Sequence, residues 1–355
     1  MIEKLVGISE IAEMAEPPVT KQAVANWRVR YDDFPKPVQT LQSGPVWNAE
    51  IIEAWLEAKA GNKPFVISFI NQKGGVAKTT TAVAVAEVLA KEFRKHVLLI
   101  DLDPQTSATI GLISEEEWAR RDADGRTLAQ LFKDKLQDEQ KFDIEESIIR
   151  GVSAVDGGIP RLELLPSSIQ FIELQEKLPF VAMHGNYDKN PQDILRRALQ
   201  PVIDRYDFVI IDCPPSLGVI TKNGLRVSTH YIIPTIPDIL STWGIFQIVN
   251  SVAYFSDDIN WQIKPLGIVA TKVQANALHD RIMRQLSEGR LFNELKTDLK
   301  QPPLFKNFIK QNVDTARGAE FLAPMHTLRQ KYKINYDSFY GLTTEILEAC
   351  KTSKN

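Results

Sequence analysis

The segment that most constrains the fold is Phe65–Thr81, which reads FVISFINQKGGVAKTTT. Strand-forming residues come first, a glycine-rich turn follows, and a lysine with three threonines then opens a helix. The backbone N–H groups of such a turn point toward a bound anion, and the N-terminus of the helix adds positive potential. This order of strand, turn and helix therefore predicts a phosphate-binding loop.

The residues of this loop have distinct expected roles. The glycines allow the backbone to approach the phosphates without a Cβ clash. Lys78 is expected to neutralise the β- and γ-phosphates, the Thr79 hydroxyl to coordinate Mg²⁺, and Thr80 to donate to an α- or β-phosphate. The predicted nucleotide-binding residues are Lys73, Gly74, Gly75, Val76, Ala77, Lys78, Thr79 and Thr80.

The spacing of the loop departs from the common P-loop pattern. That pattern needs glycines directly before the lysine and five residues earlier, where this chain has Ala77 and Gln72. The chain instead reads K-G-G-x-x-K-T, with a second lysine, Lys73, ahead of the glycines. Lys73 is then either a solvated side chain or a second cation with a special purpose at the site.

Carboxylates follow two other apolar runs. Asp101 and Asp103 come after the run 97–100, and Asp212 comes after the run 208–211. Carboxylates at strand ends beside a phosphate loop can hold Mg²⁺ directly or through water, and can orient an attacking water. Aspartate is also common where strands exit into loops, but the combination of three acids with one phosphate loop favours a functional interpretation.

The motifs KGGVAKTT, IDLDPQ and IDCPPSLG resemble, in order and spacing, the deviant Walker A, A′ and B boxes of the ParA/MinD family of ATPases. The resemblance runs from about Lys63 to Leu347. It implies that the nucleotide is ATP, that Lys73 reaches across an ATP-dependent homodimer, and that Asp103 positions the water. Asp101 would support the metal and the switch, and Asp212 would be the Walker B acid. The implied catalytic residues are Lys73, Lys78 and Asp103, and the implied metal-site residues are Thr79, Asp101 and Asp212.

The predicted fold class is α/β, with the doubly wound, mostly parallel sheet of a P-loop NTPase. Short apolar runs are typical of strands buried on both faces, and helical segments lie between them. The expected strands are 65–70, 97–100, 162–165, 208–211, 230–235 and 266–270, and the expected helices are 79–92, about 191–204, about 216–227 and 240–254. The charged stretch 114–147 is expected to be surface helix and loop, and 275–333 to be peripheral helices.

A small α-helical domain is expected before the ATPase, with boundaries at 1–62 and 63–355. Helices at 8–14, 21–30 and 49–59, with a turn-and-strand segment between the last two, resemble winged helix-turn-helix modules of the AlpA/MerR type. The second helix would then read the major groove. The alternative is a three-helix dimerisation cap. The predicted DNA-binding residues on this helix are Lys21, Gln22, Asn26, Arg28 and Arg30.

Composition and the resemblance together exclude some classes of function within the family. The net charge of −3 means that DNA contacts must come from local basic patches. Two isolated cysteines argue against a disulfide framework and against iron–sulfur relatives, and the C-terminal helix lacks the basic amphipathic pattern of membrane-bound relatives. Candidate contacts for non-specific DNA are Lys222, Arg226, Lys272, Arg281, Arg284, Lys306, Lys310 and Arg317.

The function expected from the resemblance is plasmid or chromosome partition. ATP would drive dimerisation and non-specific DNA binding, and hydrolysis stimulated by a centromere-binding, ParB-like partner would release the DNA. The N-terminal module would bind operator DNA for autoregulation. Such a protein would be cytoplasmic and nucleoid-associated, without a membrane partner. The alternatives are a nucleotide-switched transcriptional regulator and a cargo-positioning ATPase of the same family.

Overall fold

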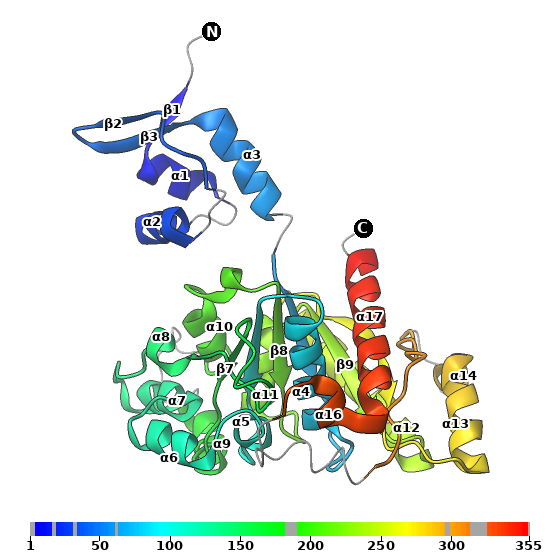
Figure 1. Cartoon of the computed structure of the whole chain (residues 1–355). Coiled ribbons are helices and arrows are strands. Elements are labelled where there is room, and N and C mark those ends of the chain that lie inside the picture. The colour runs from blue at the N-terminus through cyan, green and yellow to red at the C-terminus, as the bar shows by residue number, and fades with distance from the viewer. Residues whose placement is uncertain are drawn as a thin grey trace. The chain divides into compact units, whose positions relative to one another are not determined.

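The computed structural model divides the chain into two compact units, Met1–Pro64 and Phe65–Asn355. Figure 1 shows the helices and strands of both units. The structure describes residues 4–15, 19–30, 34–60, 63–181, 190–294, 299–312 and 325–353. In this part of the chain no helix has the length and apolar character needed to cross a bilayer.

The N-terminal unit combines three helices with a small antiparallel sheet of order β1-β3-β2. Its core is aromatic: the Phe34 and Trp55 ring centroids are 4.8 Å apart, and those of Trp27 and Trp55 are 5.6 Å apart. Trp47 is completely buried, and its indole N–H donates to the Pro35 carbonyl. The elements are β1 Leu5–Val6, α1 Ile8–Met14, α2 Lys21–Arg30, β2 Gln39–Leu41, β3 Gly44–Asn48 and α3 Ala49–Ala60.

The second unit is built on a seven-stranded sheet of order β10-β9-β4-β8-β5-β7-β6. All neighbouring strands are parallel except the short edge strand β6, which is antiparallel to β7. The predicted mostly parallel sheet is thus confirmed, and β6 is an addition that the apolar runs did not reveal. The strands are β4 Phe65–Phe69, β5 Val97–Asp101, β6 Ile149–Arg150, β7 Leu162–Leu165, β8 Phe208–Asp212, β9 His230–Thr235 and β10 Lys264–Ala270.

The central strands are apolar throughout because both faces of the sheet are covered. Along β4, Val66 belongs to the core on one face and Ile67 to the core on the other. Helices α4 and α17 pack on the second face, and α7, α9, α10, α11 and α12 on the first. The helices of eight or more residues are α4 Lys78–Lys91, α6 Glu115–Ala123, α7 Leu128–Gln137, α9 Phe171–Val181, α11 Val219–Val227, α12 Ile239–Asp258, α13 Ala277–Ser287 and α17 Tyr336–Ser353. The shorter ones are α5 Ser107–Ile110, α8 Ile144–Ser147, α10 Ile194–Leu199, α14 Arg290–Glu294 and α16 Leu328–Tyr332.

Two regions differ from the sequence-based expectation. The charged stretch 114–147 does not lie wholly on the surface, because α7 buries Leu128 and Phe132 in the main core. The region 275–333 is not all helical. Within it, 303–311 runs extended along the edge of β10, where the Phe305 N–H donates to the Ile268 carbonyl and the Ile309 N–H to the Ala270 carbonyl. The segment thereby covers a strand edge that would otherwise be open.

Candidate nucleotide-binding site

A cavity of about 640 Å³ lies where the central strands end, beside the loop between β4 and α4. The cross-strand pairs Phe69↔Asp212 and Asp101↔Asp212 bring the ends of β4, β5 and β8 to one level. Ligands of open parallel sheets bind at this edge. The cavity is lined by Lys73, Gly74, Gly75, Val76, Ala77, Lys78, Thr79, Thr80, Asp103, Gln105, Ser107, Pro215, Lys272, Ile309, Lys310, Gln311 and Asn312.

The loop backbone is shaped to approach an anion closely. Gly75 has a φ of +72°, which favours glycine, and a Cβ added at Gly74 or Gly75 would meet no atom within 4 Å. Ala77 is also left-handed, with a φ of 57°. The Thr271 hydroxyl, directly after β10, donates to the Val76 carbonyl at 2.8 Å and so fixes the far side of the loop. The open volume above the two glycines fits a phosphate group.

Lys78 is the buried cation of the site. Its Nζ lies 3.8 Å from Asp103 Oδ2 and 3.9 Å from Asp212 Oδ1, and only 8% of its side chain is exposed. These distances are longer than a charge-assisted hydrogen bond, which is normally below about 3 Å. The ammonium therefore retains donors for a further acceptor, and a phosphate oxygen is the acceptor that the loop predicts.

Asp212 is fully buried, and neither of its carboxylate oxygens has a hydrogen-bond partner among the described residues. Burial raises the pKa of Asp212 to about 6, although the Lys78 ammonium opposes the shift. The Lys78 ammonium is 3.9 Å away, and a fully buried carboxylate without a close hydrogen bond favours a further cation beside it. In the described part of the chain no three His, Cys, Asp or Glu side chains group to hold a metal. Mg²⁺ at Asp212 would therefore take its other ligands from Thr79, phosphate and water.

Asp101 and Asp103 are held differently. Asp101 accepts hydrogen bonds from the Asp103 N–H at 3.0 Å and from the Thr109 hydroxyl at 2.7 Å, so its carboxylate fixes the turn that follows β5. Burial, followed by the charge of Asp212, raises the pKa of Asp101 to about 8. Asp103 binds the Gln105 N–H through Oδ1, while Oδ2 is the atom nearest Lys78. Asp103 therefore lines the cavity. Asp101 holds the backbone of the turn that carries Asp103.

Lys73 is engaged outside the loop. Its ammonium donates to Asp238 Oδ2 at 2.7 Å and to Ser241 Oγ at 3.0 Å, at the start of α12. Partial burial would raise the pKa of Asp238, but the bonds from Lys73 and Ser241 outweigh it and lower that pKa. The Lys73 side chain remains 41% exposed. Within one chain, then, Lys73 stands at the rim of the cavity with an acid as its partner.

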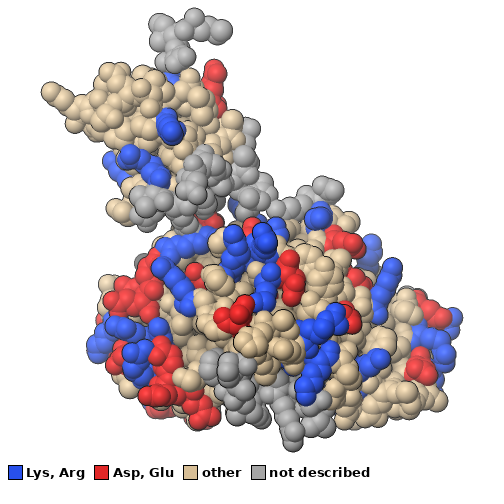
Figure 2. Space-filling view, in the orientation of Figure 1, with Lys and Arg blue, Asp and Glu red and all other residues tan. Residues whose placement is uncertain are grey.

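The predicted DNA-binding residues fall in different places. Lys272 and Lys310 line the nucleotide cavity, whereas Arg281 and Lys306 are exposed. On α2, Lys21, Gln22 and Arg28 are exposed, and the Arg28 guanidinium lies 5.2 Å from the centre of the Trp47 ring. The side chains of Asn26 and Arg30, and all of Arg317, lie outside the described residues. On the ATPase face in view, basic side chains are interspersed with acidic ones, so charge alone marks no DNA surface (Figure 2).

Sequence reasoning missed the wall formed by Ile309, Lys310, Gln311 and Asn312. It also missed Thr271, which holds the loop from the end of β10. The position of Thr271 directly after an apolar run could have indicated its role. The 309–312 wall has no such signal, since it depends on pairing between 303–311 and the edge of β10.

The chain is similar in sequence to one family model and to several known proteins. The family model described as an AAA domain matches residues 65–265. The sporulation initiation inhibitor protein Soj of Bacillus subtilis is 34% identical over 59% of this chain and 73% of its own length. The chromosome partitioning protein ParA of Myxococcus xanthus is 28% identical over 80% of this chain and 88% of its own.

A solved structure shares the fold. It is a candidate plasmid partition protein from Borrelia burgdorferi B31 bound to AMPPNP. The superposition has a TM-score of 0.57 at 23% identity, and covers 82% of this chain and 100% of that one. The order of sheet, loop and helices described above is therefore that of a P-loop NTPase fold.

Proposed function

Because the chain belongs to the ParA/MinD type of P-loop ATPases, we propose that it is a DNA-partition ATPase whose ATP-bound homodimer binds DNA non-specifically. Hydrolysis, stimulated by a centromere-binding, ParB-like partner, ends each binding event. The name of the Myxococcus xanthus relative, a chromosome partitioning protein, motivates partition as the process. Such a cycle takes place on the nucleoid, in the cytoplasm.

The observation that carries the proposal is the grouping of one buried cation and two acids at the 640 Å³ cavity: Lys78 and Asp103 line it, and Asp212 lies 3.9 Å from the Lys78 ammonium. Lys78 is positioned for the β- and γ-phosphates, and Asp212 with Thr79 for Mg²⁺, which when bound would neutralise charge on the phosphates. Asp103 lines the same cavity and is the base that would orient the attacking water. Within one chain the phosphate, metal and water roles are filled without Lys73, whose ammonium pairs with Asp238. This favours a role for Lys73 across the dimer.

Lys73 explains why hydrolysis would depend on dimerisation. In the single chain its ammonium is neutralised by Asp238. Closure of two subunits over two nucleotides would exchange that partner for the γ-phosphate of the opposite subunit. A cation supplied in this way stabilises the transferring phosphoryl group only while the dimer is closed. Dimer lifetime and hydrolysis are then coupled.

We expect Asp103→Ala to separate ATP binding from ATP hydrolysis. The full chain should bind random duplex DNA with ATP and not with ADP, and Asp103→Ala should keep the ATP-dependent binding while hydrolysis falls by roughly 100-fold or more. Filter binding or fluorescence anisotropy and phosphate release measure the two properties. DNA binding that ignores the nucleotide, or that is confined to one sequence, would instead favour the nucleotide-switched transcriptional regulator.

For the N-terminal unit we propose operator binding through α2, with β2 and β3 as the wing. The support is local: α2 exposes Lys21, Gln22 and Arg28, and its opposite face buries Val24 and Trp27 in the unit's own core. A dimerisation cap remains the competing interpretation. The fold of the unit by itself does not separate the two, since three helices and a hairpin can serve either purpose.

The double substitution Lys21→Gln with Gln22→Ala should therefore abolish preference for the chain's own upstream DNA and leave random-duplex binding with ATP within about twofold. Lys4→Gln, which removes the same charge from an exposed lysine of this unit outside α2, is the matched surface control. A shift of the full chain toward monomer in the double variant, with sequence preference unchanged, would support the dimerisation cap and refute operator binding.

A further inference from the structure

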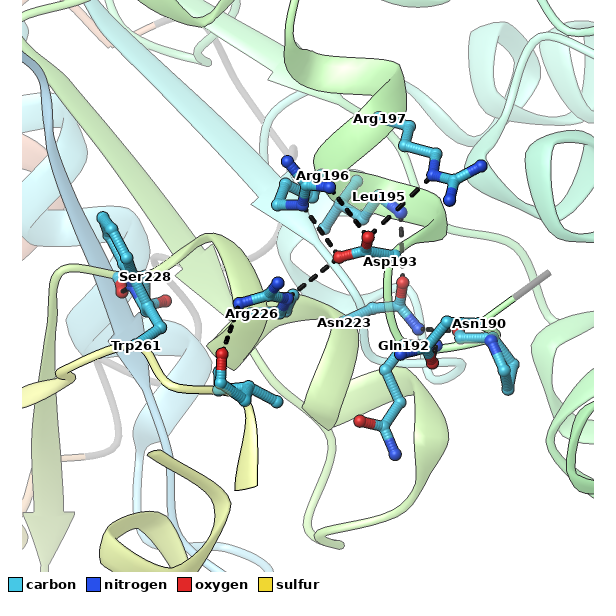
Figure 3. Close-up of polar contacts among 12 residues, drawn as sticks. Asn190, Gln192, Asp193, Leu195, Arg196, Arg197, Asn223, Arg226, Ser228 and Trp261 are labelled. Carbon is cyan, nitrogen blue, oxygen red and sulfur yellow. Dashed lines mark hydrogen bonds and ion pairs between the residues drawn. The ribbon is translucent and has the colours of Figure 1, made fainter. Parts of the chain in front are cut away.

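An organised cluster of arginines lies on α10 and α11, outside the nucleotide site (Figure 3). Arg196 forms a bidentate pair with Asp193, through Nε to Oδ1 at 2.8 Å and Nη2 to Oδ2 at 2.8 Å. Arg226 Nε also donates to Asp193 Oδ1 at 2.9 Å, and Arg197 Nε lies 3.9 Å from Oδ2. Three guanidinium groups from two helices thus surround one carboxylate.

The charges in this cluster are not balanced. Hydrogen bonds from Arg196, and next from Arg226, lower the pKa of Asp193 to about 2, although burial opposes this shift. The carboxylate therefore stays ionised. One negative charge faces three positive ones, and an excess of two positive charges remains. The side chains of Arg196 and Arg197 are 45% and 51% exposed. An ion pair that served stability alone would not need this surplus, whereas an anion-binding surface would.

The cluster is also held in place before any ligand arrives. The Asn223 side chain on α11 accepts from the Leu195 N–H at 3.0 Å and donates to the Pro191 carbonyl at 2.7 Å. Arg226 Nη1 donates to the Ile259 carbonyl at 3.4 Å. Because the loop before α10 is tied to α11, the guanidinium groups lose less freedom on binding, which favours affinity.

The position of the cluster separates it from ATP chemistry. Arg226 lies near the end of α11, and the Thr229 hydroxyl, three residues on, accepts from the Val66 N–H at the start of β4. The phosphate loop follows the other end of β4. The arginines are therefore near the amino ends of the strands, while the nucleotide cavity lies at the carboxyl ends. A substitution here leaves the nucleotide cavity intact.

The chemistry of the cluster fits the sugar–phosphate backbone of DNA. Guanidinium groups match phosphate oxygens with paired N–H donors. Trp261, two residues after the Ile259 carbonyl that Arg226 binds, is 44% exposed and is anchored by its indole N–H to the Ser228 carbonyl at 2.8 Å. Lys222, one turn before Arg226 on α11, adds a further cation. Because Lys272 and Lys310 line the nucleotide cavity, this surface is the better organised source of DNA contacts.

We propose that Arg196, Arg197 and Arg226, aligned by Asp193, form a contact for the phosphate backbone of duplex DNA on the ATPase unit. The proposal rests on the non-specific DNA binding proposed above and assigns it a surface. Two of the three arginines were not among the basic residues that the sequence singled out.

The test compares Arg196→Gln/Arg197→Gln with Arg120→Gln/Arg290→Gln, in the full chain with ATP and random duplex DNA. The control removes the same charge from exposed arginines of α6 and α14. We expect the test variant to lose at least tenfold in affinity at physiological salt, and the slope of log K against log salt to fall by about two. DNA-free ATPase activity should not change.

Equal losses in test and control variants would show that only bulk charge matters, and unchanged binding of the test variant would show that DNA lies elsewhere; either result overturns the proposal. If the unsubstituted chain bound no DNA with ATP, the proposed function itself would fail. Arg197→Gln alone, against Arg290→Gln, keeps the test decisive should the double variant unfold. Among the described residues, the Arg197 side chain makes only the 3.9 Å contact with Asp193. We expect Arg197→Gln to lower the slope of log K against log salt by about one.

Discussion

Lys78→Ala should remove nucleotide binding and lower ATP hydrolysis by roughly 100-fold or more. The expected effect is large because Lys78 is the buried ammonium of the site, 3.8 Å from Asp103 and 3.9 Å from Asp212. Without it, phosphate oxygens would approach two buried carboxylates with no countercharge from the loop. The like-charge repulsion would act on the bound nucleotide directly.

Binding is best measured by the thermal shift on adding Mg²⁺ and ATP. A ligand that binds the native state stabilises it by about 2.7 kcal/mol at a concentration 100 times its Kd. The unsubstituted chain should show this shift and Lys78→Ala should not. Lys91→Ala is the matched control, since Lys91 ends the same helix and pairs with Asp156 at 3.1 Å far from the loop. Turnover by Lys78→Ala within a few-fold of the unsubstituted chain would refute the assigned role.

The sequence predicted those parts of the site whose residues are adjacent to buried strands. A fully apolar run identifies a strand, and parallel strands end at one edge, so the sequence alone places Asp103 and Asp212 beside the phosphate loop. The prediction depends on local patterns and on one general rule of parallel sheets. It needs no knowledge of which strands are neighbours.

The contacts that depend on tertiary pairing could not be predicted in this way. Lys73 and Asp238 are 165 residues apart, and only the proximity of the β4 and β9 ends brings them together. Lys272 and Lys310 looked like surface cations because charge carries no information about which side of a segment faces a cavity. The arginines around Asp193 were hidden for a related reason. Arg196 and Arg226 lie 30 residues apart and share a carboxylate only in the folded chain.

Lys73→Gln should abolish ATP hydrolysis without unfolding the protein. The Lys73 side chain is 41% exposed, and its ion pair with Asp238 lies at the surface, where such pairs contribute at most about 1 kcal/mol. The unfolding midpoint should therefore change little. Asp238→Asn, which removes the partner and keeps the lysine, serves as the control for loss of the ion pair and should retain hydrolysis. Normal turnover by Lys73→Gln would refute the role of this lysine.

Mixing two inactive variants distinguishes a lysine that acts across the dimer from one that acts in its own subunit. In a heterodimer of Lys73→Gln with Asp103→Ala, the site of the first subunit keeps Asp103 and receives Lys73 from the second. Its other site lacks both groups. Random pairing makes half of the dimers mixed, each with one complete site, so about a quarter of the normal activity should return. If Lys73 served its own subunit, every site would lack one group and no activity would return. Recovery on mixing would therefore establish that each subunit completes the catalytic site of the other.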